Sequence, residues 1–210
     1  MTAQRRETNL QKTPISIAVL SSDMLENRHV QSLGDLADGS VPGLRVASFG
    51  SRNSALVIGI RGVGFLGDAN QPAREQGVGV YMDGIYLGRA QGLGAALYDI
   101  ERIEVLKGPQ GTLFDRNTEG GAISIVSKKP TGEFNLNASA GVGNFGAYET
   151  ALHLDLPSAG NISLKFDGVI QKRGGTTDNP MAGQLDFNGY DRRGAHVAAL
   201  WEPSSNFSAL

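Results

Sequence analysis

The chain has 210 residues, a formal net charge of −2 and no cysteine, which fits one or two domains and excludes disulfides, thiol nucleophiles and thiolate metal sites. The nearly balanced charge argues against a nucleic-acid partner, and no apolar run approaches the ~18 residues that a membrane helix needs. The 29 glycines are spread along the chain, which indicates the tight turns and bulges of a β-rich protein.

The first 62 residues predict strands interleaved with two short helices. Short helices are expected to begin at residues 23–26 and 32–35, and Gly39 is the expected C-terminal stop of the second. Strands are predicted over residues 14–20, 41–46 and 55–62. The last of these has apolar side chains on both faces, which predicts a central and buried strand.

A hairpin follows the loop-like residues 63–77. Asp83 and Gly84 stand between two apolar arms within residues 78–87. An Asp-Gly pair suits a type I′ turn, because both central residues of that turn need positive φ.

Residues 99–130 are the most informative stretch and predict a strand, a glycine-rich loop and a second strand. Ile103 and Val105 alternate with charged residues, and residues 107–111 then break the strand with glycine and proline. Two glycines precede a second apolar run at residues 122–126.

Beyond Pro130 the pattern becomes a series of segments of ~10 residues with one apolar face. The segments lie within residues 134–142, 148–156, 162–167 and 195–201, and turns are expected at 143–146 and 158–161. This alternation is typical of transmembrane barrel strands, and equally of any antiparallel sheet with one wet face.

The 99–130 stretch closely resembles the signature of the plug domain of TonB-dependent outer-membrane receptors. Three earlier pieces, at residues 9–17, 60–62 and 80–86, are similar to that family in the same order. The resemblance implies an α+β plug domain, a small mixed sheet with short helices, followed by antiparallel transmembrane β-barrel strands of an incomplete barrel. The implied divisions are 1–8 as the remnant of an N-terminal coupling segment, 9–130 as the plug, and 131–210 as about four first barrel strands.

Both ends of the chain lead us to expect a fragment. Residues 2–6 resemble the stretch that follows the energy-coupling TonB box, and residues 1–7 lack the apolar region of a signal peptide. About four strands cannot close a barrel, and their unpaired edges would be left in the membrane.

The resemblance also implies the function. Such a receptor is not an enzyme, and its plug gates the energy-coupled uptake of a scarce solute. The expected cargo is an iron–siderophore complex, with cobalamin, haem or oligosaccharide as alternatives. The implied partners are a TonB-type energy-coupling protein of the inner membrane, the cargo and outer-membrane lipid. No cofactor, metal site or nucleic acid is expected. The implied location is the bacterial outer membrane, with the plug facing the periplasm within the barrel lumen.

Two sets of site residues are expected from this reading. The residues expected in plug–barrel contact and gating are charged or turn-forming: Arg61, Gly62, Asp83, Gly84, Glu101, Glu104, Lys107, Gly108, Gly111, Arg116, Gly120 and Gly121. For each charge an ordinary solvated salt bridge is an equal alternative. The residues expected to contact cargo, chosen by side-chain type on the loops at 49–53, 64–76 and 88–93, are Phe65, Asn70, Gln71, Arg74, Arg89 and Gln91.

Two positions depart from the family pattern. Asp115 stands where the family most often has glycine, and Glu119 stands where a small or hydroxyl residue is common. Both departures concern the packing of the loop between the two strands of the 99–130 stretch. At position 115 the turn is expected to be kept, because Asp tolerates a left-handed backbone better than most residues.

Two other classes of protein fit parts of the sequence. Residues 62–67 match a dinucleotide-binding GxGxxG run, and residues 107–112 look like a phosphate loop, but neither has the helix or residue order that such a site needs. The histidines at 29, 153 and 196 lack metal-ligand spacing and are expected on the surface or in the lumen. A soluble β-rich binding module would explain the strands after residue 130, but not the 99–130 signature.

Overall fold

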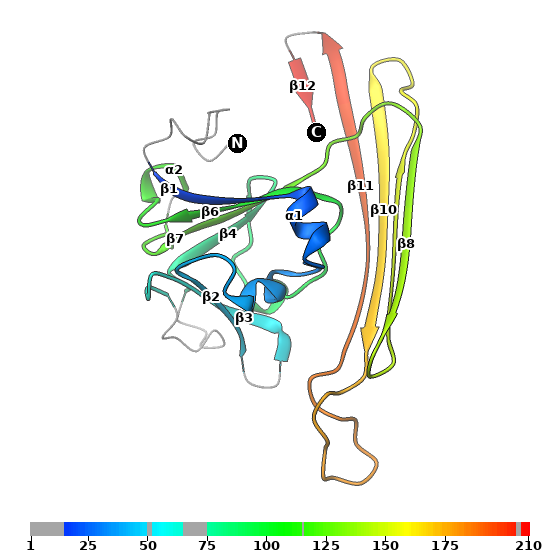
Figure 1. Cartoon of the computed structure of the whole chain (residues 1–210). Coiled ribbons are helices and arrows are strands. Elements are labelled where there is room, and N and C mark those ends of the chain that lie inside the picture. The colour runs from blue at the N-terminus through cyan, green and yellow to red at the C-terminus, as the bar shows by residue number, and fades with distance from the viewer. Residues whose placement is uncertain (1–14, 50–51, 65–74, 115, 205–206) are drawn as a thin grey trace. The chain divides into compact units, whose positions relative to one another are not determined.

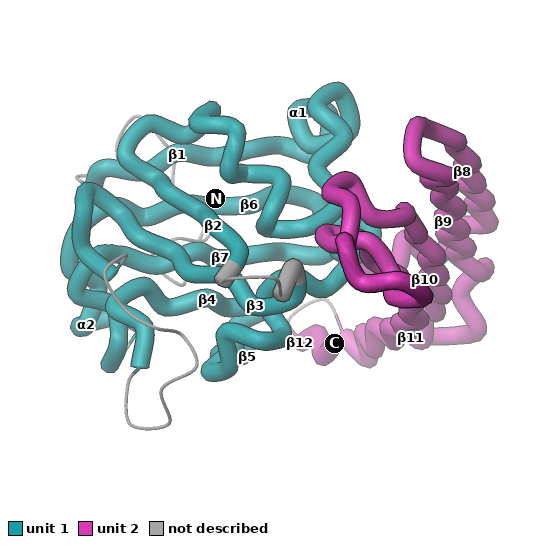
Figure 2. The backbone as a smooth tube through the Cα atoms, turned by 90° about the horizontal axis from the view of Figure 1, so that it is seen from below, with its two compact units in different colours: residues 1–127 teal, residues 128–210 magenta. Residues whose placement is uncertain are grey.

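The computed structural model describes residues 15–49, 52–64, 75–114, 116–204 and 207–210. The chain forms two compact units, residues 1–127 and 128–210, which are coloured separately in Figure 2. Among the described residues, no helix has the length and apolar character to cross a membrane.

The first unit contains a five-stranded sheet in the order β1-β6-β7-β4-β5 (Figure 1). Its strands are β1 (Ser16–Ser21), β4 (Val78–Met82), β5 (Ile85–Tyr86), β6 (Ile100–Lys107) and β7 (Gly121–Ser127). The β4–β7 pair is parallel and the other described pairs are antiparallel. A separate two-stranded ladder joins β2 (Leu44–Phe49) to β3 (Arg52–Ile60). The connecting helices are α1 (Ser22–Asn27), η2 (Leu33–Asp38), η3 (Ala90–Gly92) and α2 (Gly111–Phe114).

The second helix begins and ends at the capping residues that the sequence predicts, whereas the first begins two residues earlier than expected, with Ser21 and not Asp23 as its N-cap. The Ser21 side chain accepts a hydrogen bond from the Met24 N–H at 3.4 Å at the start of α1. At η2, the Asp35 carboxylate accepts the Ser32 N–H at 2.7 Å, and Gly39 ends the helix with a left-handed φ of 78°. The second helix is a short 3-10 helix between these two caps.

Two clusters of apolar side chains form the core of the first unit, one on each face of the five-stranded sheet. Ile103 and Val105 of β6 join the larger cluster, together with residues of β2, β3, α1 and η2. Leu106, the next residue of β6, faces the smaller cluster with Tyr81 and Phe114. The period-two pattern of β6 therefore supplies both faces of the sheet.

The burial predicted for the strand at residues 55–62 is confirmed, but the prediction that it is central was wrong. Ala55, Ile58 and Ile60 are fully buried, yet among the described strands β3 pairs only with β2, in a two-stranded ladder. The segment around η3 packs on β3, and the Gly94 N–H donates to the Ser54 carbonyl at 3.0 Å. This turn, rather than a second neighbouring strand, accounts for part of the burial.

The second unit is an antiparallel meander in which each strand pairs with its neighbours in the chain (Figure 1). Its strands are β8 (Asn135–Gly143), β9 (Ala147–Asp155), β10 (Ile162–Arg173), β11 (Tyr190–Ser204) and β12 (Phe207–Ala209). The antiparallel strands that the alternating pattern predicts are confirmed, and β12 adds a short fifth strand.

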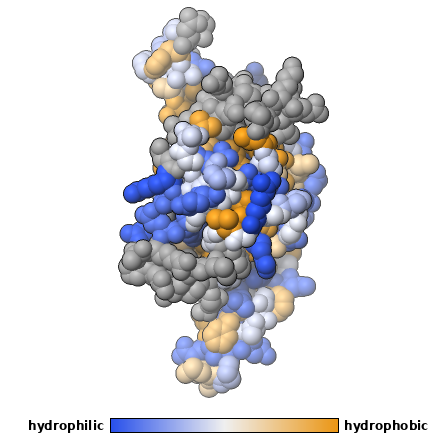
Figure 3. All heavy atoms as spheres, turned by 90° about the vertical axis from the view of Figure 1, so that its left-hand side faces the viewer, coloured by the Kyte–Doolittle hydropathy of each residue, from blue (hydrophilic) through white to orange (hydrophobic). Residues whose placement is uncertain are grey.

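This second sheet exposes its apolar face. Leu136, Phe166 and Val197 lie in one cross-strand row and are 54%, 40% and 60% exposed. On the opposite face, Lys165 and Asp167 are 1% and 5% exposed, and they lie beside the buried apolar residues Val169, Ala198 and Leu200. The exposed apolar row and the buried charges are the unusual part of this sheet. Soluble sheets show the reverse arrangement. The visible face of the first unit in Figure 3 shows the ordinary arrangement, with hydrophilic side chains around small apolar patches.

Gly121 offers a direct test of the β6–β7 connection. Its φ is 145°, and a Cβ atom at this position would lie 2.2 Å from the Leu106 carbonyl oxygen. We therefore expect Gly121→Ala to destabilise the β6–β7 ladder by about 2 kcal/mol or more, because backbone strain and a clash with a fixed carbonyl act together. Hydrogen exchange of the β6 and β7 amides measures this loss.

Two glycines of the same loop are matched controls. Gly108→Ala meets open space but keeps a positive φ of 104°, so it reports the backbone strain alone. Gly111→Ala has neither problem and is expected to change stability by less than about 0.5 kcal/mol. Equal exchange rates in all three variants would contradict the packing described for Gly121.

Asp38 gives the first unit an acid-sensitive contact. Hydrogen bonds from Ser40, together with the Arg28 guanidinium, lower the pKa of Asp38 from 3.8 to about 2. Because the folded pKa is depressed, this contribution is fully present above pH ~4 and is lost as the pH falls towards 2. We expect amide protection in α1 and η2 to fall over that window.

Asp38→Asn keeps the acceptor oxygen and removes the titration. The variant should show a lower but pH-independent protection of α1 and η2 between about pH 4 and pH 2. A variant with the same pH dependence as the parent protein would assign the effect to another carboxyl group.

Candidate functional site

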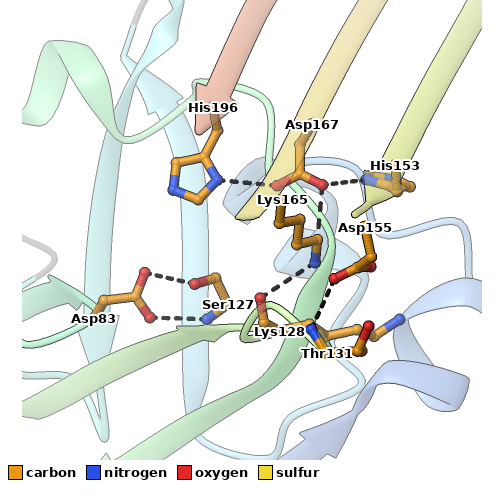
Figure 4. Close-up of polar contacts among 9 residues, drawn as sticks. All are labelled: Asp83, Ser127, Lys128, Thr131, His153, Asp155, Lys165, Asp167 and His196. Carbon is orange, nitrogen blue, oxygen red and sulfur yellow. Dashed lines mark hydrogen bonds and ion pairs between the residues drawn. The ribbon is translucent and has the colours of Figure 1, made fainter. Parts of the chain in front are cut away.

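Asp83 ties the β4–β5 hairpin to the end of β7. Asp83 and Gly84 have φ values of 48° and 84°, which confirms the predicted turn with positive φ at both positions. The Asp83 carboxylate accepts hydrogen bonds from the Ser127 N–H and hydroxyl, both at 2.9 Å (Figure 4). The hairpin thus holds the last residue of the first unit.

The glycine-rich loop between β6 and β7 is closed by backbone hydrogen bonds. The Gly108 N–H donates to the Gly120 carbonyl, and the Gln110 N–H donates to the Thr118 carbonyl, each at 3.0 Å. The Gly120 N–H in turn donates to the Gly77 carbonyl at 2.9 Å. The loop is therefore compact and attached at both ends.

Aromatic side chains hold this loop against the sheet. The Tyr81 ring lies 4.9 Å from the Phe114 ring and 5.3 Å from the Tyr86 ring, measured between centroids. The Tyr81 hydroxyl donates to the Phe114 carbonyl, and the Asn117 side-chain amide donates to the Tyr86 hydroxyl at 3.1 Å. These contacts fix α2 over the small apolar cluster.

Arg102 forms ion pairs with the two acidic residues of β6. Its Nε donates to the fully buried Glu104 carboxylate at 2.8 Å, and its guanidinium also pairs with Glu101. Burial opposes the charge of Arg102, but the hydrogen bond to Glu104 and the field of both carboxylates outweigh it and raise the pKa of Arg102. Glu101 and Glu104 thus have a partner within the first unit, and their pairing with a barrel wall stays a prediction.

The other expected gating residues lie at strand ends and in the loop. Arg61 and Gly62 follow β3 with positive φ, and the Arg61 guanidinium donates to the Ser16 hydroxyl at 2.8 Å. Lys107 is half-buried at the end of β6, opposite Gly121. Arg116 is exposed.

Most of the expected cargo residues fall outside the described part of the chain. Phe65, Asn70, Gln71 and Arg74 lie there, as do residues 1–8 and Asp115. Arg89 and Gln91 are described, and both are exposed at η3. Their role stays a prediction.

A hydrogen-bonded row crosses the polar face of the second sheet. His153, Asp167 and His196 are direct cross-strand neighbours on β9, β10 and β11. The two histidine Nδ1 atoms lie 2.8 and 2.9 Å from the two oxygens of Asp167, and Lys165 Nζ lies 3.8 Å from the same carboxylate (Figure 4). Both carboxylate oxygens of Asp167 thus have a histidine neighbour, and the expected absence of a metal site stays a prediction.

The same face holds the segment that enters the second sheet. Lys165 Nζ donates to the Lys128 carbonyl at 3.2 Å, and the Thr131 N–H donates to the Asp155 carboxylate at 2.9 Å (Figure 4). The Ser158 N–H donates to the Gly132 carbonyl at 2.8 Å. These contacts attach residues 128–132 to β9, β10 and the turn between them.

Sequence patterns alone did not find these polar contacts. The histidines stand 43 positions apart in the numbering, and only the strand register brings them to one carboxylate. The alternation of the segments did place His153 and Asp155 on the polar side. Several of these contacts end on backbone groups, including the Ser127 and Thr131 N–H groups and the Lys128 carbonyl.

Comparison with known proteins agrees with this arrangement. The pesticin receptor of Yersinia pestis is 29% identical over 180 residues, covering 83% of this chain and 25% of that protein. The ferrichrome outer membrane transporter/phage receptor of Escherichia coli K12 is 26% identical over 213 residues, covering all of this chain and 26% of that protein. The chain thus spans about a quarter of the length of these curated relatives.

A solved structure gives the same picture of the fold. The ferric yersiniabactin uptake receptor FyuA of Yersinia pestis superposes with a TM-score of 0.79 at 25% identity, covering 91% of this chain and 29% of that one. The family model described as TonB-dependent Receptor Plug Domain matches residues 9–122, more than half of the sequence. The chain therefore belongs to the family of TonB-dependent receptors.

Proposed function

We propose that this chain provides the plug and the first wall strands of an outer-membrane receptor for energy-coupled uptake of a ferric siderophore. In this role residues 9–130 act as the plug and residues 131–210 as the first strands of the barrel. The receptor moves its cargo without making or breaking a covalent bond.

The observation that carries the proposal is the sheet that follows the plug. Apolar side chains at 40% exposure or more line one face of β8 to β11, whereas Lys165, Asp167 and Gln171 on the other face are buried. Fully burying a large apolar side chain is worth about 1.5–3 kcal/mol, so this face is unfavourable in water and favourable against lipid. A bacterial outer membrane with the polar face towards a lumen satisfies both faces.

The printed names of the relatives support iron–siderophore cargo. One relative is a ferrichrome transporter and one solved structure is a ferric yersiniabactin uptake receptor. Cobalamin, haem and oligosaccharide are the alternative cargoes of the family, and no relative reported above is named for them. We therefore assign a ferric siderophore to this chain.

Energy coupling would act through the N-terminal end of the plug. In the proposal, a TonB-type protein of the inner membrane pulls on residues 1–8. The first described strand after them, β1, lies at an edge of its sheet and pairs with β6, from Ser16 opposite Lys107 to Ser21 opposite Arg102. Tension would load this edge ladder before the central strands, because β6 and β7 have neighbours on both sides.

Uptake of radiolabelled iron by cells tests the proposal. Cells carrying the full-length receptor as their sole ferric siderophore receptor should bind and accumulate iron supplied as ferrichrome or ferric yersiniabactin. An uncoupler, or deletion of the TonB-type protein, should abolish accumulation and leave surface binding unchanged.

The control is the same strain without the receptor, which should neither bind nor accumulate either complex. Accumulation that continues without the proton gradient would contradict energy coupling. A receptor that binds neither of these complexes nor a ferric tris-catecholate would contradict the assigned cargo.

A further inference from the structure

Two arginines and a tyrosine gather on the polar face of the second sheet, at one end of β10 and β11. Arg173 is the cross-strand neighbour of Tyr190, and Gln171 is the neighbour of Arg192. Alternation along each strand places these side chains on the same face as Asp167 and His196. The four residues therefore form one block of neighbours on that face.

The tyrosine holds both guanidinium groups. Arg192 Cζ lies 4.4 Å from the centroid of the Tyr190 ring, and Arg173 Cζ lies 5.0 Å from it. A nitrogen of the Arg173 guanidinium also donates to the Asn188 carbonyl at 3.2 Å. The cations are thus positioned before any ligand arrives, which lowers the entropic cost of binding.

The charge of these arginines is not balanced within the described part of the chain. The nearest acid on β11, Asp191, points to the opposite face and pairs there with Arg193 at 3.0 Å and Lys172 at 3.9 Å. Glu149 of β9 lies across from Gln171, and no ion pair joins it to Arg173 or Arg192 among the described residues. Arg173 and Arg192 therefore both lie over the Tyr190 ring, and no ion pair with a described carboxylate neutralises either of them.

Two buried polar atoms in this block also have no hydrogen-bond partner among the described residues. They are Nε of Arg173 and Oε1 of Gln171, and the Gln171 residue is 4% exposed. Native proteins satisfy most buried polar atoms, so the unsatisfied donor of Arg173 beside two unpaired cations indicates a place for a hydrogen-bond acceptor. The Gln171 oxygen is itself an acceptor and adds no support for an anion.

We infer that Arg173, Arg192 and Tyr190 form a subsite for an anionic group of the cargo, such as a carboxylate or catecholate of the ferric chelate. This inference rests on the proposed function and specifies the charge of its cargo. A guanidinium binds two oxygens in one plane, which is the geometry of a carboxylate or of the two oxygens of a catecholate, and the tyrosine keeps the two guanidinium groups close together.

The position of the block supports a soluble ligand. Residues 174–189 connect β10 and β11 at this end and form the longest connection of the sheet among the described strands. Long loops lie on the outer side of outer-membrane barrels, where cargo arrives. Lipid phosphate is the less favoured source of the anion, since lipid would contact the opposite, apolar face.

Charge removal on the two faces of the same strands tests the inference in the full-length receptor. The test variant is Arg173→Gln/Arg192→Gln, and its matched control is Lys172→Gln/Arg193→Gln, which removes the same charge from the other face. The probes are an anionic ferric tris-catecholate and the uncharged hydroxamate ferrichrome. We expect the test variant to bind the tris-catecholate at least about tenfold more weakly. Its affinity for ferrichrome, and both affinities of the control, should change less than about twofold.

Folding is checked separately from binding. Heat-modifiable gel mobility reports whether each variant forms its barrel, and Arg173→Lys/Arg192→Lys keeps the charge if the glutamine variant does not fold. The lysine variant should retain more tris-catecholate affinity at low salt than at high salt, because it binds as a point charge.

Three results would overturn the inference while leaving the proposed function intact. They are unchanged tris-catecholate affinity in the test variant, an equal loss in the matched control, or an equal loss for ferrichrome. A parent receptor that binds ferrichrome alone would also overturn it. A parent receptor that binds no ferric chelate would overturn the proposed function and the inference together.

Discussion

The second sheet exposes a row of large apolar side chains on one face and buries Lys165, Asp167 and Gln171, beside the apolar Val169, Ala198 and Leu200, on the other, and this arrangement constrains the rest of the account. Water makes the exposed row that contains Leu136, Phe166 and Val197 unfavourable, and hydrocarbon makes it favourable. Burial of Lys165 and Asp167 is tolerable because each has a partner: Lys165 bonds the Lys128 carbonyl, and Asp167 accepts from two histidines. The same polar contacts attach the entering segment of the chain. In the proposed barrel, one alternating pattern would supply both the lipid-facing and the lumen-facing side chains.

The first unit, in contrast, buries its apolar side chains in a core of its own. Its five-stranded sheet has apolar clusters on both faces, and its signature loop is closed by backbone hydrogen bonds rather than by side-chain charges. Asp83 then holds Ser127, where that unit ends. A gate in a wet lumen needs such internal cohesion, because its outer contacts must break and form again. In the proposed mechanism, the edge strand β1 is the part that yields first.

Local signals in the sequence predicted local structure well. Gly39 ends its helix, and Asp83 and Gly84 adopt positive φ, because these conformations depend on a few adjacent residues. Side-chain contacts across the sheets were not predicted. His153 and His196 meet at Asp167 only through strand register, and Arg173 meets Tyr190 across a connection of residues 174–189. The position of β3 was wrong for a related reason, since the apolar pattern reports burial and does not identify the covering element.

The central claim is that the apolar face of the second sheet contacts lipid, and site-directed spin labelling of β11 tests it most directly. These 210 residues contain no cysteine, so single labels can be placed at residues 195 to 200 without a competing site in this part of the chain. The measurement uses the full-length receptor in outer-membrane vesicles, with any cysteine outside these residues replaced by serine. We expect collisions with oxygen, which concentrates in lipid, to alternate with a period of two. The maxima should fall at residues 195, 197 and 199, and the minima at 196, 198 and 200. Uniform accessibility along β11, or maxima at the even positions, would contradict the account.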